Sequence, residues 1–193
     1  MSSAGQDCLF RFGCLDDHNS PREFFHLNRF SEETTSGVPR LAIGSTSPLP
    51  VFLKLAAVLK PPFDVLYILH TSRCDNELGR YQSPPIDAST FEAFTTKFAD
   101  FLSTDGRHDL WLHSRSPEGT VAWDRHNLIY AYGPLDRFAD VLRAEGLIEG
   151  VVSLPTLHTH HYHACFDDDE RGILQYVDWT RSPLWPGDIQ YQP

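Results

Sequence analysis

The alternation of apolar and polar residues is clearest between residues 108 and 146. Leucines alternate with a tryptophan and a histidine over residues 109–114, which is the period-two pattern of a half-buried strand. The SPEG segment that follows, residues 116–119, has proline and glycine where a type I turn accepts them. An asparagine that tolerates positive φ marks a second turn at residues 125–127. The pattern predicts antiparallel strands at 109–114, 120–124 and 128–132.

Apolar residues at helical spacing define three further segments. Phenylalanines recur every three or four positions over residues 88–103, where Ser89 and Glu92 have the spacing of a capping box. Pro61-Pro62 ends the apolar segment that begins at residue 51, and Gly133-Pro134 stands at the start of the apolar segment that extends to residue 145. The sequence therefore predicts helices at 51–59, 88–103 and 134–145.

The remaining strands have weaker boundaries. Residues 63–71 are nearly continuous in apolar residues and are expected in the middle of a sheet. Strand structure is also expected between residues 148 and 163, with a break at Pro155. Residues 72–85 are polar and are expected to be an irregular connection. In the N-terminal part, short strands are expected at 9–12, 24–27 and 41–43.

Together these elements predict the fold class. We expect a single α+β domain over residues 1–193, with a mainly antiparallel or mixed sheet covered by three to four helices. The strands within residues 1–45 are the least certain part of this scheme. Residues 179–193 contain three prolines and are expected to form an irregular arm on the body of the domain.

Composition and charge exclude several classes of protein. A hydrophobic content of 41% is typical of a globular chain, and the net charge of −10 argues against a broad nucleic-acid surface. The N-terminus lacks the pattern of a secretory signal, and the longest apolar stretch is too short to span a membrane. Because the four cysteines show no paired spacing, we expect free thiols and a cytoplasmic location.

Two of the predicted strands have a short internal sequence similarity. The segment LYILHTSR at residues 66–73 resembles LWLHSR at residues 110–115, and Leu157-His158-Thr159 is a shorter match. If these strands were neighbours with the same direction, His70, His113 and His158 would gather at one rim of the sheet.

The most distinctive chemistry lies in four histidines within the six positions 158–163. In an extended strand, His158 and His160 share one face while His161 and His163 share the other. Zinc needs three or four ligands, so others must come from elsewhere, with Asp167 the leading choice. Further residues of suitable type are Asp169, Cys165, His70 and His113.

The segment His158-Thr159-His160 followed by His163 resembles the opening of the metallo-β-lactamase ligand motif. Tyr162 stands where that motif has its aspartate, so the resemblance ends there and no other property of that family is carried over. Phosphate-binding loops and a nucleophile elbow are absent from the sequence, and the surroundings of Cys74 do not indicate an activated thiol.

Aromatic residues interspersed with acidic and histidine positions suit the recognition of a basic protein. The preferred interpretation is a cytoplasmic, non-enzymatic binding protein without a cofactor, similar in logic to immunity or inhibitor proteins, with neither nucleic acid nor membrane as partner. The alternative is a zinc-type, metal-dependent hydrolase that uses the histidines of residues 158–163, so whether the chain is an enzyme stays open. The candidate binding residues are His70, Arg73, Trp111, His113, Tyr130 and Tyr132, and further aromatic candidates are Trp123, Trp179 and Trp185.

Overall fold

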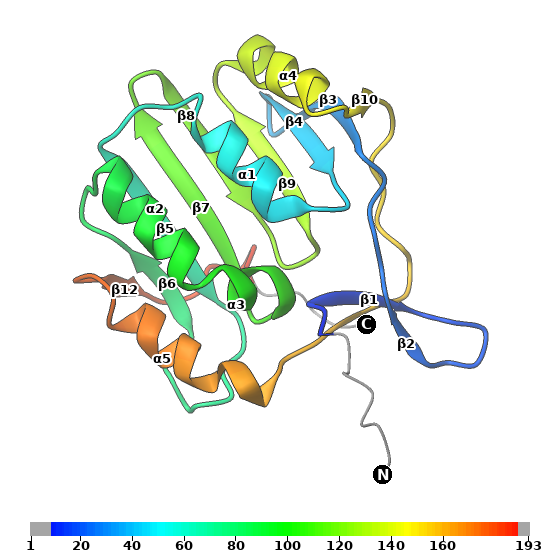
Figure 1. The fold of residues 1–193 in the computed structure, drawn as a ribbon, viewed down its shortest axis with the longest axis vertical. Helices are drawn as coiled ribbons and strands as arrows, with labels where there is room; N and C mark the ends of the chain where they lie inside the picture. The colour runs from blue at the N-terminus through cyan, green and yellow to red at the C-terminus, as the bar shows by residue number, and fades with distance from the viewer. Residues whose placement is uncertain (1–8, 189–193) are drawn as a thin grey trace.

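A computed structural model describes residues 9–188, and within this range the chain forms an α+β fold with a layer of helices against a large, mainly antiparallel sheet (Figure 1). The large sheet has nine strands in the order β10-β3-β4-β9-β8-β7-β5-β6-β12. Only the pair of β10 with β3 is parallel. Its strands are β3 (Arg29–Thr35), β4 (Val38–Gly44), β5 (Phe63–Leu69), β6 (Gly79–Gln82), β7 (His108–Arg115), β8 (Glu118–Trp123), β9 (Leu128–Tyr132), β10 (Ile148–Glu149) and β12 (Thr180–Ser182).

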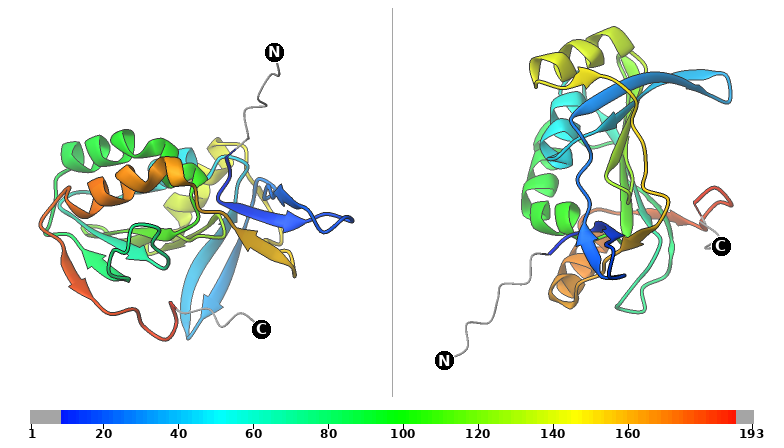
Figure 2. Two further views of the ribbon diagram at one scale, coloured as in Figure 1. Left: turned by 90° about the horizontal axis from the view of Figure 1, so that it is seen from below. Right: turned by 90° about the vertical axis from the view of Figure 1, so that its right-hand side faces the viewer.

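A second, small sheet joins the N-terminal part of the described chain to residues 158–160. Strand β1 (Phe12–Leu15) lies between β2 (Pro21–Glu23) and β11 (His158–His160), and both pairs are antiparallel. In this register Phe12 pairs with His160 and Cys14 pairs with His158. The small sheet projects beside one end of the large sheet (Figure 2).

The helices cover one face of the large sheet and leave most of the other face open (Figure 2). The period-two pattern explains this arrangement, because in β7 the leucines and Ser114 are buried while Trp111 and His113 are only partly buried. The buried sides of the strands and helices share one core, in which Phe52, Trp123 and Phe138 are fully enclosed. The helices are α1 (Pro48–Ala56), α2 (Ala88–Lys97), α3 (Ala99–Thr104), α4 (Leu135–Ala144), α5 (Asp167–Leu174) and the short 3-10 helix η1 (Ala164–Phe166).

The α+β fold class predicted from the sequence is confirmed, although the sheet is larger than expected. The helix expected over residues 88–103 is divided at Phe98 into α2 and α3. Its N-terminal cap is Asp87, which accepts a hydrogen bond from the N–H of Thr90, and not the expected Ser89. Asp87 therefore satisfies one of the free N–H groups of the first turn.

Several local predictions were wrong. The turn between β7 and β8 contains Ser116 and a cis-Pro117, so the glycine that was expected in the turn lies in β8. The connection at residues 72–85 contains strand β6, whose pairing with β5 gives it regular structure. The expected strand region of residues 148–163 forms two short strands in different sheets. Strand β10 pairs with β3 in the large sheet, and β11 pairs with β1 in the small sheet.

The two ends of the chain also differ from expectation. The strand expected at residues 24–27 is not formed, and strands lie on either side of it, in β2 and β3. Part of the C-terminal arm is regular, since β12 pairs with β6, while residues 189–193 lie outside the described range. Cys14, Cys74 and Cys165 are free thiols as expected, and Cys8 lies outside the described range. Among residues 9–188, no helix is both long and apolar enough to cross a membrane.

Candidate metal-binding site and adjoining pocket

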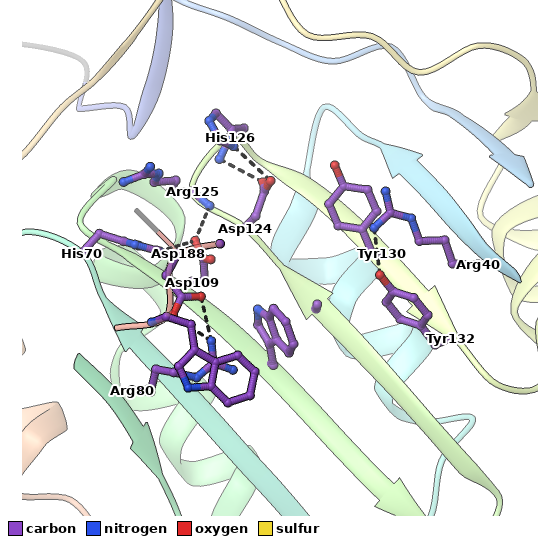
Figure 3. A pocket seen from close by; sticks show the side chains of 14 residues that line it. Arg40, His70, Arg80, Asp109, Asp124, Arg125, His126, Tyr130, Tyr132 and Asp188 are labelled. Atoms are coloured by element: carbon purple, nitrogen blue, oxygen red, sulfur yellow. Dashed lines mark hydrogen bonds and ion pairs between the residues drawn. The ribbon is translucent and has the colours of Figure 1, made fainter. Parts of the chain in front are cut away.

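The open face of the large sheet carries a pocket of about 380 Å³ over the strands β4, β9, β8, β7 and β6. Alternation along the strands places the lining side chains there, because their neighbours point into the helix-covered core. Figure 3 shows Arg40, Tyr130 and Tyr132 on one side of the pocket and His70, Asp109 and Arg125 on the other. The residues 185–188 of the C-terminal arm complete its wall with Trp185, Gly187 and Asp188.

Two ion pairs neutralise arginines of this pocket. Arg80 donates to both carboxylate oxygens of Asp188, at 2.7 and 2.9 Å, and its guanidinium lies 4.0 Å from the centre of the Trp185 ring. Arg40 pairs with Glu33, and its guanidinium lies 4.0 Å from the centre of the Tyr130 ring. Both contacts combine charge pairing with cation–π attraction, so they hold the aromatic side chains in place.

Two carboxylate–imidazole pairs lie near the start of β7 and the end of β8. His70 Nε2 is 3.0 Å from an oxygen of Asp109, and His126 Nδ1 is 3.0 Å from an oxygen of Asp124 (Figure 3). The turn itself positions Asp124, because its other oxygen accepts the backbone N–H groups of His126 and Leu128. The pKa of Asp109 is lowered, since the favourable contact with His70 outweighs the opposing effect of burial.

The second of these pairs belongs to a cluster of three histidines. His126, from the turn between β8 and β9, meets His158 and His160 from strand β11, and one ligand nitrogen from each lies within 4.8 Å of the others. His158 and His160 share one face of β11, as the period of an extended strand requires. The pairing of β11 with β1 brings that face to the end of the large sheet. This arrangement gathers three metal-ligating groups from distant parts of the sequence.

His160 is the histidine with the fewest interactions in this cluster. Both of its ring nitrogens are buried and make no hydrogen bond within residues 9–188. Burial, together with the neighbouring charges of His126 and Arg125, lowers the pKa of His160 to about 3. The imidazole is therefore neutral at physiological pH, which is the state that ligates a metal ion.

The other residues expected to ligate a metal lie elsewhere. His161 and His163 occupy the opposite face of the segment, where His161 contacts Thr159 and His163 contacts the carbonyl of Phe10. Asp167 begins α5 and pairs with Arg73 and Arg107. Among the described residues, the candidate cluster thus includes two of the five expected ligands, together with His126.

The expected binding residues are divided in a similar way. His70, Trp111, Tyr130 and Tyr132 all line the pocket of the open face. His113 lies near the C-terminal end of β7, where it pairs in register with Asp64. Since β5 and β7 are antiparallel, His70, which follows β5, lies at the other end of β7. The expected gathering of His70, His113 and His158 at one rim does not occur. Arg73 is exposed and pairs with Asp167 near α5.

Sequence reasoning missed His126 and Asp124. The signal that was available is their spacing, since an aspartate two residues before a histidine in a tight turn can contact its ring. The turn was identified from the sequence, but its meeting with β11 depends on pairing between β1 and β11, which are separated by more than 140 residues.

Comparison with protein-family models, with curated proteins and with solved structures gave no match. The geometry described above is therefore the basis on which the function is inferred.

Proposed function

We propose that this protein is a metal-dependent hydrolase of the zinc type, in which His126, His158 and His160 hold the metal ion. The observation that carries the proposal is the convergence of three histidine nitrogens within 4.8 Å, where both ring nitrogens of His160 are buried without a hydrogen bond to residues 9–188. In a tetrahedral zinc site with bonds of about 2.0–2.1 Å, ligand nitrogens are roughly 3.4 Å apart, so modest ring rotations complete the site.

The surroundings of His126 match the requirements of a metal ligand. Metal-bound histidines usually use their second nitrogen to contact a carboxylate, which fixes the ring and increases its basicity. Asp124 occupies that position, 3.0 Å from Nδ1 of His126, so Nε2 is the nitrogen of His126 assigned to the metal. The carbonyl of Pro155 lies 3.3 Å from Nδ1 of His158 and assigns Nε2 there as well.

Three protein ligands leave one position of a tetrahedral zinc ion for water. Zinc held by these three histidines would supply a water of lowered pKa for the hydrolysis of an ester or related group. His126 also lines the open pocket, so a molecule bound there lies next to the metal. Chemistry of this kind needs such a pocket, which a purely structural metal site does not.

The other function expected from the sequence, recognition of a basic protein partner, has less support. The acidic run of residues 167–170 contributes few free charges, because three of its four carboxylates pair with arginines of the same chain. Trp123, one of the expected aromatic contacts, is fully buried in the core.

Metal analysis of untagged protein tests the proposal. We expect one equivalent of zinc after purification or after titration of the metal-free protein, and we expect His160→Ala to lose it. His161→Ala is the matched control, because it removes a neighbouring histidine that faces the other way. Zinc binding that is equal in the two variants would contradict the assignment of ligands.

Hydrolysis is tested separately with p-nitrophenyl acetate and p-nitrophenyl phosphate. We expect zinc-dependent turnover of at least one of these by the wild-type protein and by His161→Ala, and loss of turnover in His160→Ala. Tight zinc binding without any zinc-dependent turnover would retain the metal site and reject the hydrolase.

A further inference from the structure

The pocket beside His126 contains hydrogen-bond donors that have no acceptor. Nε1 of Trp111 is buried and makes no hydrogen bond within residues 9–188. The guanidinium of Arg125 has no hydrogen bond or ion pair among the same residues, although its backbone N–H donates to Asp109. Because a buried donor is normally paired, the indole N–H of Trp111 indicates an acceptor that arrives with a ligand, and the partly exposed guanidinium of Arg125 lines the same pocket.

Arg125 is the lining arginine that has no ion pair among residues 9–188. The lining includes three arginines and three aspartates, and the aspartates pair with His70, His126 and Arg80. Arg40 is neutralised by Glu33 from the adjacent strand. Counted with neutral histidines, the three arginines and three aspartates of the lining balance in formal charge, so the feature that points to an anion is the single guanidinium without a carboxylate partner among residues 9–188. A guanidinium of this kind pairs readily with the acidic group of a ligand.

The walls of the pocket are aromatic. Trp111, Tyr130 and Tyr132 line it from the strands of the sheet, and Trp185 lines it from the C-terminal arm. Arg80 and Arg40 stack against two of these rings at 4.0 Å and fix their orientation before any ligand enters. A volume of about 380 Å³ is at the lower end of the range for small-molecule sites, so it suits a ligand with one ring.

We infer that the pocket binds a small organic anion, with its carboxylate or phosphate group against Arg125 and Trp111 and its planar ring between the aromatic walls. The inference rests on the proposed function, because a ligand in this pocket also lies beside His126 and is then the substrate. It adds the substrate class, which the three histidines alone do not specify. Arginine suits both acidic groups, since its planar guanidinium forms paired hydrogen bonds with carboxylate or phosphate oxygens.

Isothermal titration calorimetry of the metal-free protein with benzoate and phenyl phosphate tests the inference. We expect saturable binding of at least one probe to the wild-type protein, and the tighter probe identifies the acidic group. Acetate and inorganic phosphate test the ring, and each is expected to bind at least tenfold more weakly than its aromatic counterpart. Equal affinity for probes with and without the ring would overturn the assignment of the aromatic walls.

The variant Arg125→Met tests the anion-binding group. Loss of a hydrogen-bonded ion contact weakens binding by about tenfold or more. Arg115→Met is the matched control, because Arg115 is the last residue of β7, lies outside this pocket, and is an exposed arginine that pairs with Asp64 at 3.6 Å. Trp111→Phe keeps the ring and removes the indole N–H, so a smaller loss is expected.

The inference is overturned if neither aromatic probe binds, or if Arg125→Met binds them as tightly as Arg115→Met does. Thermal unfolding of each variant confirms that it is folded. Because these titrations contain no metal, their result is independent of the zinc titration. Anion binding without zinc binding would reject the proposed hydrolase and keep the pocket, and the reverse result would reject the pocket alone.

Discussion

Arg107 and Glu170 form an ion pair in which neither side chain is exposed to solvent. Arg107 precedes β7 and Glu170 lies in α5, so the pair joins the helix to the large sheet. Arg107 also pairs with Asp105 at 2.7 Å and donates to the carbonyl of His163 at 3.0 Å. The acidic run in the first turn of α5 therefore has a structural role, because it anchors the segment that follows the histidines of β11.

We expect Glu170→Ala to lower the free energy of unfolding by about 3 kcal/mol, since removal of one partner leaves the other charge buried. Asp168→Ala is the control, because Asp168 is 98% exposed and pairs with Arg171 on the surface of the same helix. Its loss is expected to cost less than about 0.5 kcal/mol. Urea unfolding of both variants measures the difference, and equal losses would contradict the buried role of Glu170.

Arg11 connects the small sheet to the large one. It is fully buried and donates to the carbonyls of Leu102, His108 and Asp124, at 2.7, 2.7 and 3.1 Å. Arg11→Met removes these three hydrogen bonds from the buried interface of the two sheets, so we expect a loss of about 2–4 kcal/mol in unfolding free energy. Zinc affinity is expected to fall as well, because β1 positions β11.

The exposed Arg22 of β2 provides the control for that experiment. Its side chain pairs with Asp16 and is 70% exposed. Arg22→Met is expected to leave both stability and zinc affinity within error of the wild type. A normal zinc affinity in Arg11→Met would show that the small sheet does not depend on this contact.

His108 gives the protein a specific sensitivity to acid. Burial between Tyr67 and Phe101, reinforced by the nearby charges of Arg11 and Arg107, holds the pKa of His108 well below its ordinary value. Below pH 6.5 the unfolded chain binds a proton at this residue and the folded chain does not. Stability contributed by the neutral ring is therefore present at higher pH and is lost as the pH falls.

Replacement of His108 by leucine removes this proton uptake. Between pH 7.5 and 5.5, we expect the wild-type protein to lose about 1.4 kcal/mol more unfolding free energy than His108→Leu. Urea unfolding of metal-free protein at the two pH values measures the difference. Parallel losses in the two proteins would mean that His108 is protonated in both the folded and the unfolded states.

The effect of replacing His160 on stability is expected to depend on whether metal is present. In the metal-free protein, His160→Leu should be at least as stable as the wild type, because the buried ring nitrogens have no partner within the described chain. With zinc at a hundred times its dissociation constant, the wild type should gain about 2.7 kcal/mol that the variant does not gain. Thermal unfolding with and without zinc tests this, and a gain of equal size in both proteins would contradict it.

Sequence periodicity predicted the parts of the fold in which local and tertiary preferences agree. Strands β7, β8 and β9 have alternating residues and short turns, so their pairing follows from the chain itself. Strand β6 was missed because its residues are polar and charged, and its structure depends on pairing with β5 on one side and β12 on the other. Such context is not present in a local window of sequence.

The candidate site shows the same limit. The alternation of β11 correctly placed His158 and His160 on one face, because that follows from strand geometry alone. The third histidine could not be predicted in this way. His126 lies in a turn of the large sheet, whereas His158 and His160 lie in a strand of the small sheet. Only the contact between the two sheets brings the three histidines together.

Strand β11 pairs with β1, which lies near the start of the described chain. During synthesis the ribosome releases β1 and the turn that holds His126 long before it releases β11. A nascent chain therefore presents a single histidine of the cluster until residue 160 has emerged. Under the proposed function, assembly of the metal site is thus a late step in the maturation of this protein.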